Sequence, residues 1–509
     1  MYPGVYAERT PDRPAVIMSD TGETLTFADL EERSARLARL LYERGLRRGD
    51  NFALLAENGP RYYEAYWAAQ RSGLYITAIN HNLSPSEVAY IVNDCGARVL
   101  IASVNKSATA TAIADLTPAV EGRLAFDGAV PGHSDLETEL AATDAIPVPD
   151  DRVGGDMLYS SGTTGLPKAI KQPLPERRLG EPGDPYVAVF GKMYGFDEQT
   201  VYLCPAPLYH AAPFRFGGWV QALGGTVVVM PRFDPTAALR AIERFHVTHS
   251  QWVPTMFVRM LKLPENVRRR FDLSSQRVAV HAAAPCPIEV KQAMIDWWGP
   301  ILHEYYASTE GMGITLIDSA QWLAKPGSVG KAGMGILHIC DDAGKEVPVG
   351  EIGTIYFERE TLPFSYHKDP EKTKSAQHPR HSNWTTSGDI GRVDDDGYLF
   401  LTDRKAFMII SGGVNIYPQE IENVLTLHPK VFDIAVIGVP DPEFGEQVKA
   451  VVQPAPQIHP GPELEAELIE FVRERIAHFK VPRSIDFVAE LPRTPTGKLL
   501  KAKLREQYI

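Results

Sequence analysis

Residues 75–101 read YITAINHNLSPSEVAYIVNDCGARVLI, and this stretch alternates strand and helix patterns. Tyr75–Ile79 is an apolar, β-branched run typical of a buried strand. Ser84 can cap a helix whose first turn is occupied by Pro85, and Val99–Ile101 follows as a second buried strand. A strand–helix–strand unit of this kind predicts a layered α/β fold with largely parallel sheets.

The same alternation extends to both sides of this stretch. Thr26 can cap an earlier helix that Gly45 can end, and a second helical stretch covers Tyr62–Arg71. Thr226–Met230 is predicted as a further strand. Residues 173–200, in contrast, are rich in proline and glycine and are predicted to form a surface loop.

After about residue 404 the pattern changes to a short α+β set. Helices are predicted at Pro418–Leu427 and Glu463–Ala477. Strands are predicted at Ile434–Val439, Val448–Val452 and Ile485–Val488, and a loop follows at the C-terminus. We therefore predict a large N-terminal domain of layered sheets and helices, residues 1–404, and a small α+β C-terminal domain, residues 405–509.

Composition excludes several classes of protein. The chain has 509 residues, 44% of them hydrophobic and 23% charged, as is ordinary for a globular protein with more than one core. Its net charge is −12, and it has no dense lysine and arginine block, so nucleic acid is not expected as a partner. Arg268–Arg270 is read as solvated surface, with docking of a phosphorylated cofactor as the alternative.

Targeting and redox signals are also absent from the sequence. The four cysteines lie far apart without a CxxC pair, so neither a zinc site nor a disulfide framework is indicated. The N-terminal residues lack the pattern of a signal peptide. No run approaches the roughly 20 apolar residues of a membrane span. We expect a cytoplasmic protein, while its oligomeric state and peripheral membrane contact stay open.

The most informative segment is Tyr159-Ser160-Ser161-Gly162-Thr163-Thr164-Gly165-Leu166-Pro167-Lys168. Its glycines allow tight turns that expose backbone N–H groups, and its hydroxyls and lysine add donors for phosphate oxygens. It is not the GxxxxGK[ST] pattern of P-loop NTPases, because Pro167 separates the last glycine from Lys168. A phosphate-binding loop of another class is favoured over a merely flexible loop.

A second segment, Tyr305-Tyr306-Ala307-Ser308-Thr309-Glu310-Gly311, combines aromatic rings with hydroxyls and a carboxylate. Such a group could stack a base, hold a phosphate and coordinate Mg²⁺ through oxygen. In a third, Thr386-Ser387-Gly388-Asp389-Ile390-Gly391, a carboxylate on a glycine-flanked turn can accept both hydroxyls of a ribose, although such a pair is more often only a turn.

Two further segments lie in the predicted C-terminal domain. Ile409-Ile410-Ser411-Gly412-Gly413-Val414-Asn415-Ile416-Tyr417-Pro418 places a glycine pair immediately before a helix. Pro492-Arg493-Thr494-Pro495-Thr496-Gly497-Lys498 is a proline-stiffened loop that presents one lysine. Taken alone, that lysine would be read as a solvated surface residue.

In this order, the five segments resemble the acyl-CoA synthetase branch of the adenylate-forming superfamily, which includes luciferases and peptide-synthetase adenylation domains. The resemblance runs from Thr26 to Lys498. It implies an AMP-forming acid–thiol ligase that converts a carboxylic acid, ATP and CoA to acyl-CoA, AMP and pyrophosphate through an acyl-adenylate. It also implies that the C-terminal domain is mobile.

The resemblance assigns roles to individual residues. Ser160 to Lys168 would bind the ATP phosphates, and Ala283 would contact the nucleotide. Tyr306 would stack on adenine, Thr309 would touch the α-phosphate, and Glu310 would hold Mg²⁺. The remaining nucleotide residues would be Asp389 on the ribose, Arg404 beside it, and Lys498, the mobile lysine that reaches the acyl carboxylate and the α-phosphate.

Thioester formation implies a second set of residues. In the family the C-terminal domain rotates about a hinge after the residue matching Arg404, so that the lysine leaves and the stretch matching Gly412–Gly413 lines the pantetheine tunnel. The hinge position is Ala406 here, where the family has Asp or Lys. His210 matches a gate beside the acyl pocket; without the family it would be read as a core histidine.

The acyl pocket departs from the family pattern. The family's Ser-Gly-Ala-Ala-Pro reads His281-Ala282-Ala283-Ala284-Pro285, which places a methyl group and an imidazole near the acid. The other expected wall residues are Phe214, Gly217, Trp252 and Met256, all of which could equally be plain core. They favour a medium- or long-chain fatty acid, or a bulky aryl or sterol side-chain acid, over acetate.

Two other functions remain as alternatives from the sequence. One is the same adenylation followed by transfer to a carrier-protein thiol, which the absence of a carrier domain in the sequence disfavours. The other is a non-catalytic nucleotide or acyl-CoA sensor. That reading predicts loss of Lys498, Glu310 or the phosphate loop, and all of them are present.

Overall fold

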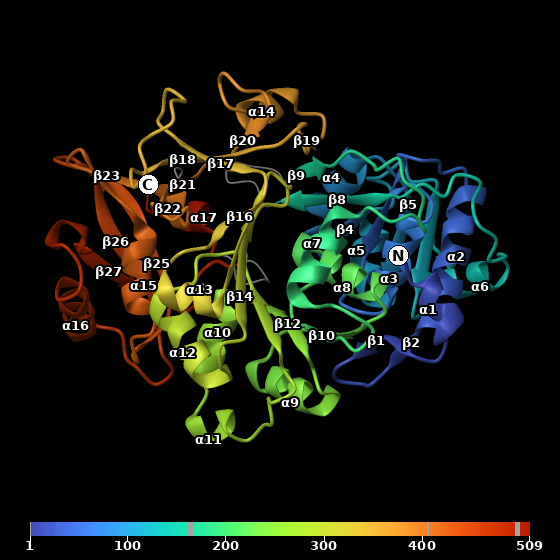
Figure 1. Cartoon of the computed structure of the whole chain (residues 1–509), viewed down its shortest axis with the longest axis horizontal. Helices are drawn as coiled ribbons and strands as arrows, with labels where there is room; N and C mark the ends of the chain where they lie inside the picture. The colour runs from blue at the N-terminus through green and yellow to red at the C-terminus, as the bar shows by residue number, and fades with distance from the viewer. Residues whose placement is uncertain (1, 161–166, 405–406, 494–498, 509) are drawn as a thin grey trace. The chain divides into compact units, whose positions relative to one another are not determined.

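The computed structural model describes residues 2–160, 167–404, 407–493 and 499–508 (Figure 1). Its contacts divide the chain into two compact units. Unit 1 contains Met1–Trp252, Glu265–Ala279 and Pro363–Pro370, and unit 2 contains Val253–Pro264, Val280–Leu362 and Glu371–Ile509. Each unit is described by itself.

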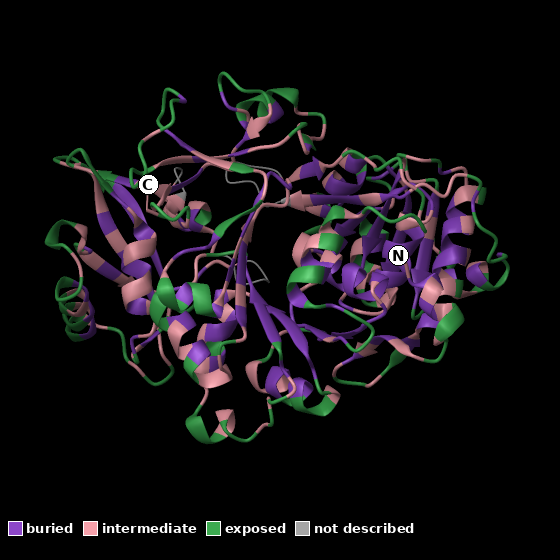
Figure 2. Cartoon of the chain, viewed as in Figure 1, coloured by how far each residue is buried: buried purple, intermediate pink, exposed green. Residues whose placement is uncertain are grey.

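Unit 1 is built on an eight-stranded sheet. Its strands, in order, are β19 (Ser365–Tyr366), β9 (Lys168–Lys171), β8 (Gly155–Ser160), β4 (Tyr75–Ile79), β3 (Asn51–Leu55), β5 (Ala97–Ser103), β6 (Gly122–Phe126) and β7 (Ser134–Asp135). The pairs formed by β8, β4, β3, β5, β6 and β7 are parallel. Residues of β3 and β4 are buried throughout, and the same strands are purple in Figure 2. The predicted parallel α/β arrangement is confirmed for this sheet.

Helix boundaries in unit 1 follow the predicted caps. Helix α2 (Phe27–Glu43) begins after Thr26, which forms a capping box with Asp29. Helix α4 (Pro85–Cys95) begins after Ser84 in the same way and ends at Gly96, whose φ of 67° is left-handed. Because the caps at Thr26 and Ser84 are local, the sequence was sufficient to place them, whereas the end of α4 at Gly96 was not predicted.

Unit 1 also holds five neighbouring strands of a second sheet and further helices. The strands, in order, are β12 (His249–Trp252), β10 (Val201–Cys204), β11 (Thr226–Val229), β1 (Pro14–Met18) and β2 (Thr24–Thr26). The other helices are α1 (Gly4–Arg9), α3 (Arg61–Gln70), α5 (Ser107–Ala112), α6 (Leu136–Ala141), α7 (Pro185–Tyr194), α8 (Ala211–Ala222), α9 (Pro235–Phe245) and α11 (Glu265–Arg268). Strand β13 (Val278–His281) contains the point at which the chain passes from unit 1 to unit 2.

The prediction of one loop over residues 173–200 was wrong, because helix α7 lies within this range. Asp184 caps the helix by accepting hydrogen bonds from the backbone N–H groups of Tyr186 and Val187, and Pro185 occupies the first turn. Phe190 and Tyr194 are buried on its inner face. Burial of this apolar face outweighs the turn-forming composition of the flanking residues.

Unit 2 contains mainly antiparallel sheets. Strands β14 (Leu302–Ala307), β15 (Ile314–Asp318) and β16 (Lys331–Met334) follow one another in antiparallel pairs. A five-stranded sheet has the order β17 (Ile336–Cys340), β18 (Gly353–Glu358), β21 (Asp389–Val393) and β22 (Leu399–Arg404), with β20 (Trp384–Thr385) beside β18. The helices that precede the last hundred residues are α10 (Pro254–Leu261), α12 (Ile288–Trp298), α13 (Ser319–Ala324) and α14 (Pro370–Ser375).

The last hundred residues form an α+β arrangement with a core of their own. The strands are β24 (Val414–Ile416), β23 (Ile409–Ser411), β26 (Gly445–Pro454) and β25 (Val431–Asp441), with β27 (Ser484–Phe487) on β26. The helices are α15 (Pro418–Thr426), α16 (Pro462–Arg473) and α17 (Lys501–Arg505). The core includes Ile421, Val436, Ala450 and Leu468.

The predicted C-terminal loop was wrong, because helix α17 follows residue 500. Leu504 is buried against strand residues that include Ala435 and Val451. The Lys501 Nζ lies 2.8 Å from a carboxylate oxygen of Glu422. Both contacts join residues far apart in sequence, and a five-residue helix has too little periodicity to be predicted without them.

In the part of the chain that the structure describes, no helix combines the length and the apolar character needed to cross a bilayer.

Candidate functional site

The second predicted motif forms a tight connection between β14 and β15. Residues 308–313 join the two antiparallel strands, and the backbone N–H of Gly311 donates to the Ser308 carbonyl at 3.0 Å. Gly311 has a φ of 72°, which favours glycine. The Arg359 guanidinium donates to the Gly311 carbonyl at 3.1 Å. The connection is therefore held in one conformation, with Thr309 and Glu310 partly exposed.

Tyr306 and Asp389 come together, although they lie in different motifs. The Tyr306 hydroxyl donates to Asp389 Oδ2 at 2.7 Å. The Ser387 hydroxyl donates to the same oxygen, also at 2.7 Å. Asp389 is only 8% exposed, so these hydrogen bonds compensate part of the loss of water around its carboxylate. Gly388, with a φ of 82°, turns the backbone between Ser387 and Asp389.

A hollow opens beside this hydrogen-bonded pair. It is lined by Tyr306, Ala307, Ser308, Met312, Gly313, Ile355, Phe357, Thr385, Thr386 and Ser387. The Oγ of Ser308 and the Oγ1 of Thr385 are buried and have no hydrogen-bond partner among the described residues. Buried hydroxyls are normally satisfied, so these two leave hydrogen-bonding capacity for a water or a polar ligand group. The sequence motifs contained or adjoined both residues but did not single them out.

The third motif, residues 386–391, is paired with the strand that contains Arg404. Strands β21 and β22 are antiparallel, and their register places Arg404 directly opposite Asp389. The side chain of Arg404 lies outside the described part of the chain. Among the described residues no cluster of three or more His, Cys, Asp or Glu could hold a metal ion.

The phosphate-loop residues are described only at their ends. Strands β8 and β9 pair in antiparallel register, with Ser160 opposite Lys168. The Lys168 Nζ donates to Asp369 Oδ2 at 3.1 Å, and both side chains are partly exposed. Ser161, Gly162, Thr163, Thr164 and Gly165 lie outside the described residues.

The lysine predicted to be catalytic, Lys498, and the predicted hinge, Ala406, also lie outside the described residues. Arg493 and Leu499, the described residues nearest to Lys498 on either side, form an isolated β-bridge. The Arg493 guanidinium forms an ion pair with Asp433.

The glycine pair, Gly412 and Gly413, forms the two-residue turn between β23 and β24. Both residues have positive φ, 58° and 79°, as this class of tight hairpin turn requires. Both are exposed, so the backbone at this turn is open to a close-approaching ligand.

The predicted gate and acyl-pocket residues of unit 1 lie around helix α8. His210 is the residue before its first turn, with its ring 4.5 Å from that of Tyr209. Phe214 is fully buried and packs edge-on to Tyr66 with the ring centroids 5.0 Å apart. A Cβ at Gly217 would lie 1.9 Å from the Tyr63 hydroxyl, so this glycine serves close packing of α3 on α8.

The remaining predicted wall residues are also buried. Trp252, in unit 1, donates from Nε1 to the Ser250 hydroxyl at 2.7 Å. Met256, His281 and Ala282, in unit 2, are 4%, 0% and 7% exposed. These values fit either a closed acyl pocket or plain core, and the acyl pocket stays a prediction.

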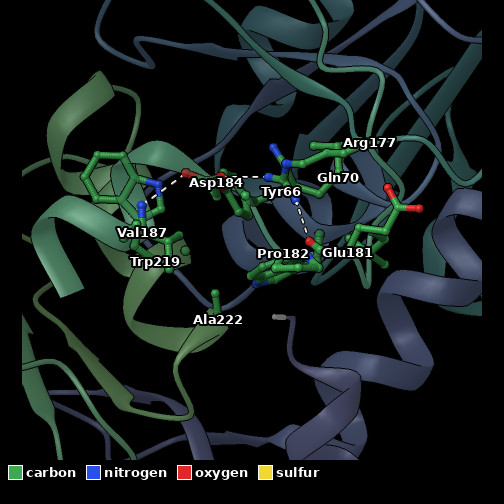
Figure 3. Close-up of a pocket in the computed structure, with 15 residues that line it drawn as sticks. Tyr66, Gln70, Arg177, Glu181, Pro182, Asp184, Val187, Trp219 and Ala222 are labelled. Carbon is green, nitrogen blue, oxygen red and sulfur yellow. Dashed lines mark hydrogen bonds and ion pairs between the residues drawn. The ribbon is translucent and has the colours of Figure 1, made fainter. Parts of the chain in front are cut away.

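A cavity of about 210 Å³ on α8 was not indicated by any motif (Figure 3). Its lining includes Tyr66 from α3, Val187 from α7 and Trp219 from α8. At its edge the Arg177 guanidinium is paired with Asp184 at 2.7 Å. With this cation already neutralised, the walls suit a hydrocarbon chain or a ring better than a phosphate.

Comparison with known families covers most of the chain. The model of the AMP-binding enzyme family matches residues 5–366, and that of the AMP-binding enzyme C-terminal domain matches residues 420–498.

Individual relatives cover nearly the full length. A feruloyl-CoA synthase of Amycolatopsis sp is 36% identical over 96% of this chain and 94% of its own. The long-chain-fatty-acid–CoA ligase FadD13 of Mycobacterium tuberculosis is 31% identical over 98% of this chain and 96% of its own. The crystal structure of the anthranilate CoA ligase AuaEII with anthranoyl-AMP superposes with a TM-score of 0.85 at 27% identity, over 99% and 96% of the two chains.

Proposed function

The chain belongs to the AMP-binding enzyme family, and from this premise we propose that it is an acyl-CoA ligase for a bulky apolar carboxylic acid. It activates the acid with ATP as an acyl-adenylate and transfers the acyl group to CoA. The observation that supports this best is that Tyr306, which donates a hydrogen bond to Asp389, lines the same hollow as two orphaned buried hydroxyls.

We assign the residues around this hollow to bind the adenosine part of ATP. The Tyr306 ring provides a face on which a base can stack. We assign Asp389 to accept hydrogen bonds from ribose hydroxyls, and the hydrogen bonds that Tyr306 and Ser387 donate to its Oδ2 orient the carboxylate for this role. Ser308 and Thr385 supply hydroxyls for the remaining polar atoms.

Activation requires that two anions meet. A carboxylate must attack the α-phosphate while negative charge grows on its oxygens. We assign Thr309, Lys498 and the 160–168 loop to hold these phosphates, and Lys498 to neutralise the acid as well. Glu310 would hold Mg²⁺, which supplies further positive charge at the phosphates when bound.

Thioester formation needs a different approach to the acyl carbon. We propose that residues 405–509 rotate as a domain about Ala406, carrying Lys498 away and bringing the Gly412–Gly413 turn to the pantetheine. The self-contained cores of this segment support such a rotation, because a body that moves as a unit needs its own packing. His210 would act as the gate beside the acid.

The experiment is a substrate panel with ATP, Mg²⁺ and CoA, read by mass spectrometry. Ferulate, anthranilate, medium- and long-chain fatty acids and a sterol side-chain acid form the panel, with acetate as the small-acid control. We expect acyl-CoA from at least one bulky acid, at a rate at least about tenfold above acetate, because an added buried methylene contributes about 0.8 kcal/mol.

Two results would contradict this proposal. Accumulation of acyl-AMP in the presence of CoA would indicate another acceptor, such as a carrier-protein thiol. Absence of both acyl-AMP and acyl-CoA with every acid would contradict adenylation itself.

The Tyr306 hydroxyl provides a test of the hollow. Tyr306→Phe retains the ring but removes the hydrogen bond to Asp389. A hydrogen bond to a charged group contributes about 1.5 kcal/mol, so the KM for ATP should rise about tenfold while kcat changes little. Steady-state kinetics with ATP varied will measure both. Tyr356→Phe, on β18, is the matched control and should behave as wild type.

A further inference from the structure

A buried ion pair joins helix α12 to strand β14 outside the hollow. Lys291 is 0% and Glu304 5% exposed, and the Nζ of Lys291 donates to Glu304 Oε2 at 2.6 Å. We propose that Lys291 and Glu304 are positioning residues that set the geometry of the two segments holding the nucleotide. This inference rests on the proposed function.

The pair lies in a nearly closed environment. The Lys291 Nζ is 5.0 Å from the centre of the Trp322 ring on α13. The His281 Nε2 lies 3.6 Å from the same Glu304 oxygen, and neither ring nitrogen has a hydrogen-bond partner among the described residues. Burial, and then the Lys291 charge, lower the pKa of His281 well below its ordinary value, so the imidazole is neutral. Burial also lowers the pKa of His303.

Three elements lie close together around the Glu304 carboxylate. His281 is the last residue of β13, Lys291 lies in the first half of α12, and Glu304 lies on β14. Residues 282–287 connect His281 to α12, so this short segment is tied to the carboxylate at its α12 end by the Lys291 hydrogen bond, while the neutral His281 ring packs 3.6 Å from the same oxygen at its other end.

The tied segment contains a strained residue. Ala283 has a φ of 74°, in the left-handed region that residues other than glycine rarely adopt. Such a conformation persists only where the surroundings enforce it, and it is frequent at functional sites. Ala283 is the residue of this segment proposed to contact the nucleotide.

On the Glu304 side, strand β14 connects the ion pair to the hollow. Two residues beyond Glu304 on β14 is Tyr306, which donates to Asp389. Side chains two apart on a strand share a face, so a shift of β14 at Glu304 is transmitted to Tyr306. The ion pair therefore links the position of Ala283 to that of Tyr306.

Stability alone does not require an ion pair at this place. Apolar residues of similar volume often replace a buried ion pair without loss of stability, whereas removal of one partner leaves an uncompensated charge. An apolar pair lacks the directional hydrogen bond that holds helix α12 and strand β14 in one relative position. A positioning role and a purely structural role therefore make different predictions.

The test compares wild type, Lys291→Met, Lys291→Met/Glu304→Leu and Glu304→Gln, with the exposed Lys345→Met as control. Thermal unfolding reports stability, and calorimetric titration with MgATP reports nucleotide affinity without need of an acid. We expect Lys291→Met to melt at least about 5 °C lower. The double variant should melt within about 3 °C of wild type but bind ATP about tenfold more weakly, and Glu304→Gln about threefold more weakly.

The outcomes distinguish a failure of the positioning role from a failure of the proposed function. A double variant with wild-type melting and wild-type ATP affinity overturns the positioning role. If the double variant does not fold, Glu304→Gln decides: wild-type affinity overturns the inference, and weakened affinity with unchanged melting supports it. Absence of ATP binding by wild type itself would refute the proposed function and this inference with it. Lys345→Met should match wild type in both measurements.

Discussion

Lys498→Ala is expected to lower the rate of acid-dependent ATP–pyrophosphate exchange about 10²–10³-fold. The lysine is proposed to neutralise both the acyl carboxylate and the α-phosphate as charge develops between them. Removal of one such preorganised donor typically costs about 3–4 kcal/mol of transition-state stabilisation. Exchange should be measured with an acid that the substrate panel has identified, at saturating ATP.

The control for this change is Lys503→Ala, an exposed lysine on the neighbouring helix α17, which should keep wild-type exchange. A second control is thioester formation from synthetic acyl-AMP and CoA. This half-reaction should stay within about threefold of wild type, because Lys498 is proposed to have left the site by then. Equal exchange in wild type and Lys498→Ala would remove the proposed mechanism.

The second large effect is expected at Glu310. Glu310→Gln replaces a charged oxygen ligand by a weaker neutral one, so the rate of exchange should fall about 10²-fold at millimolar Mg²⁺. The Mg²⁺ concentration needed for half-maximal rate should rise about tenfold in the same variant. A Mg²⁺ titration of the initial rate measures both quantities.

Glu351→Gln is the matched control, since Glu351 is an exposed glutamate of the same unit. It should leave the Mg²⁺ titration unchanged. If Glu310→Gln also keeps the wild-type rate and the wild-type Mg²⁺ requirement, the metal is held elsewhere, and the assignment of Glu310 must be withdrawn.

The order of motifs and the local signals were sufficient for much of the fold. Thr26 and Ser84 carry their capping partners three residues away, so both helix starts can be predicted from a short window. Helix α7 was missed because the prolines and glycines of residues 173–200 favoured a loop, and the cap Asp184 was not considered. Its identity as a helix depends on a buried face that no short window contains.

The site, like the fold, was predicted from the sequence only in part. The motifs named Tyr306 and Asp389 separately, but their hydrogen bond joins residues 83 positions apart. Phe214 and Gly217 were predicted as acyl wall, and the structure shows what they contact: the tyrosines of α3. Contacts of this kind depend on how helices pack, which a sequence pattern restricts but does not specify.

The sequence by itself determined the parallel α/β core and the α+β C-terminal part. These depend on local periodicity, caps and spacing, each of which is contained in a short stretch of chain. The five motifs, in their order, indicated the class of reaction through their resemblance to the adenylate-forming superfamily. Only the tertiary structure decided that Ser308 and Thr385 face one hollow with unsatisfied hydroxyls, and that Lys291 and Glu304 form a buried ion pair. Burial and pairing are properties of distant segments brought together, so no single segment contains them.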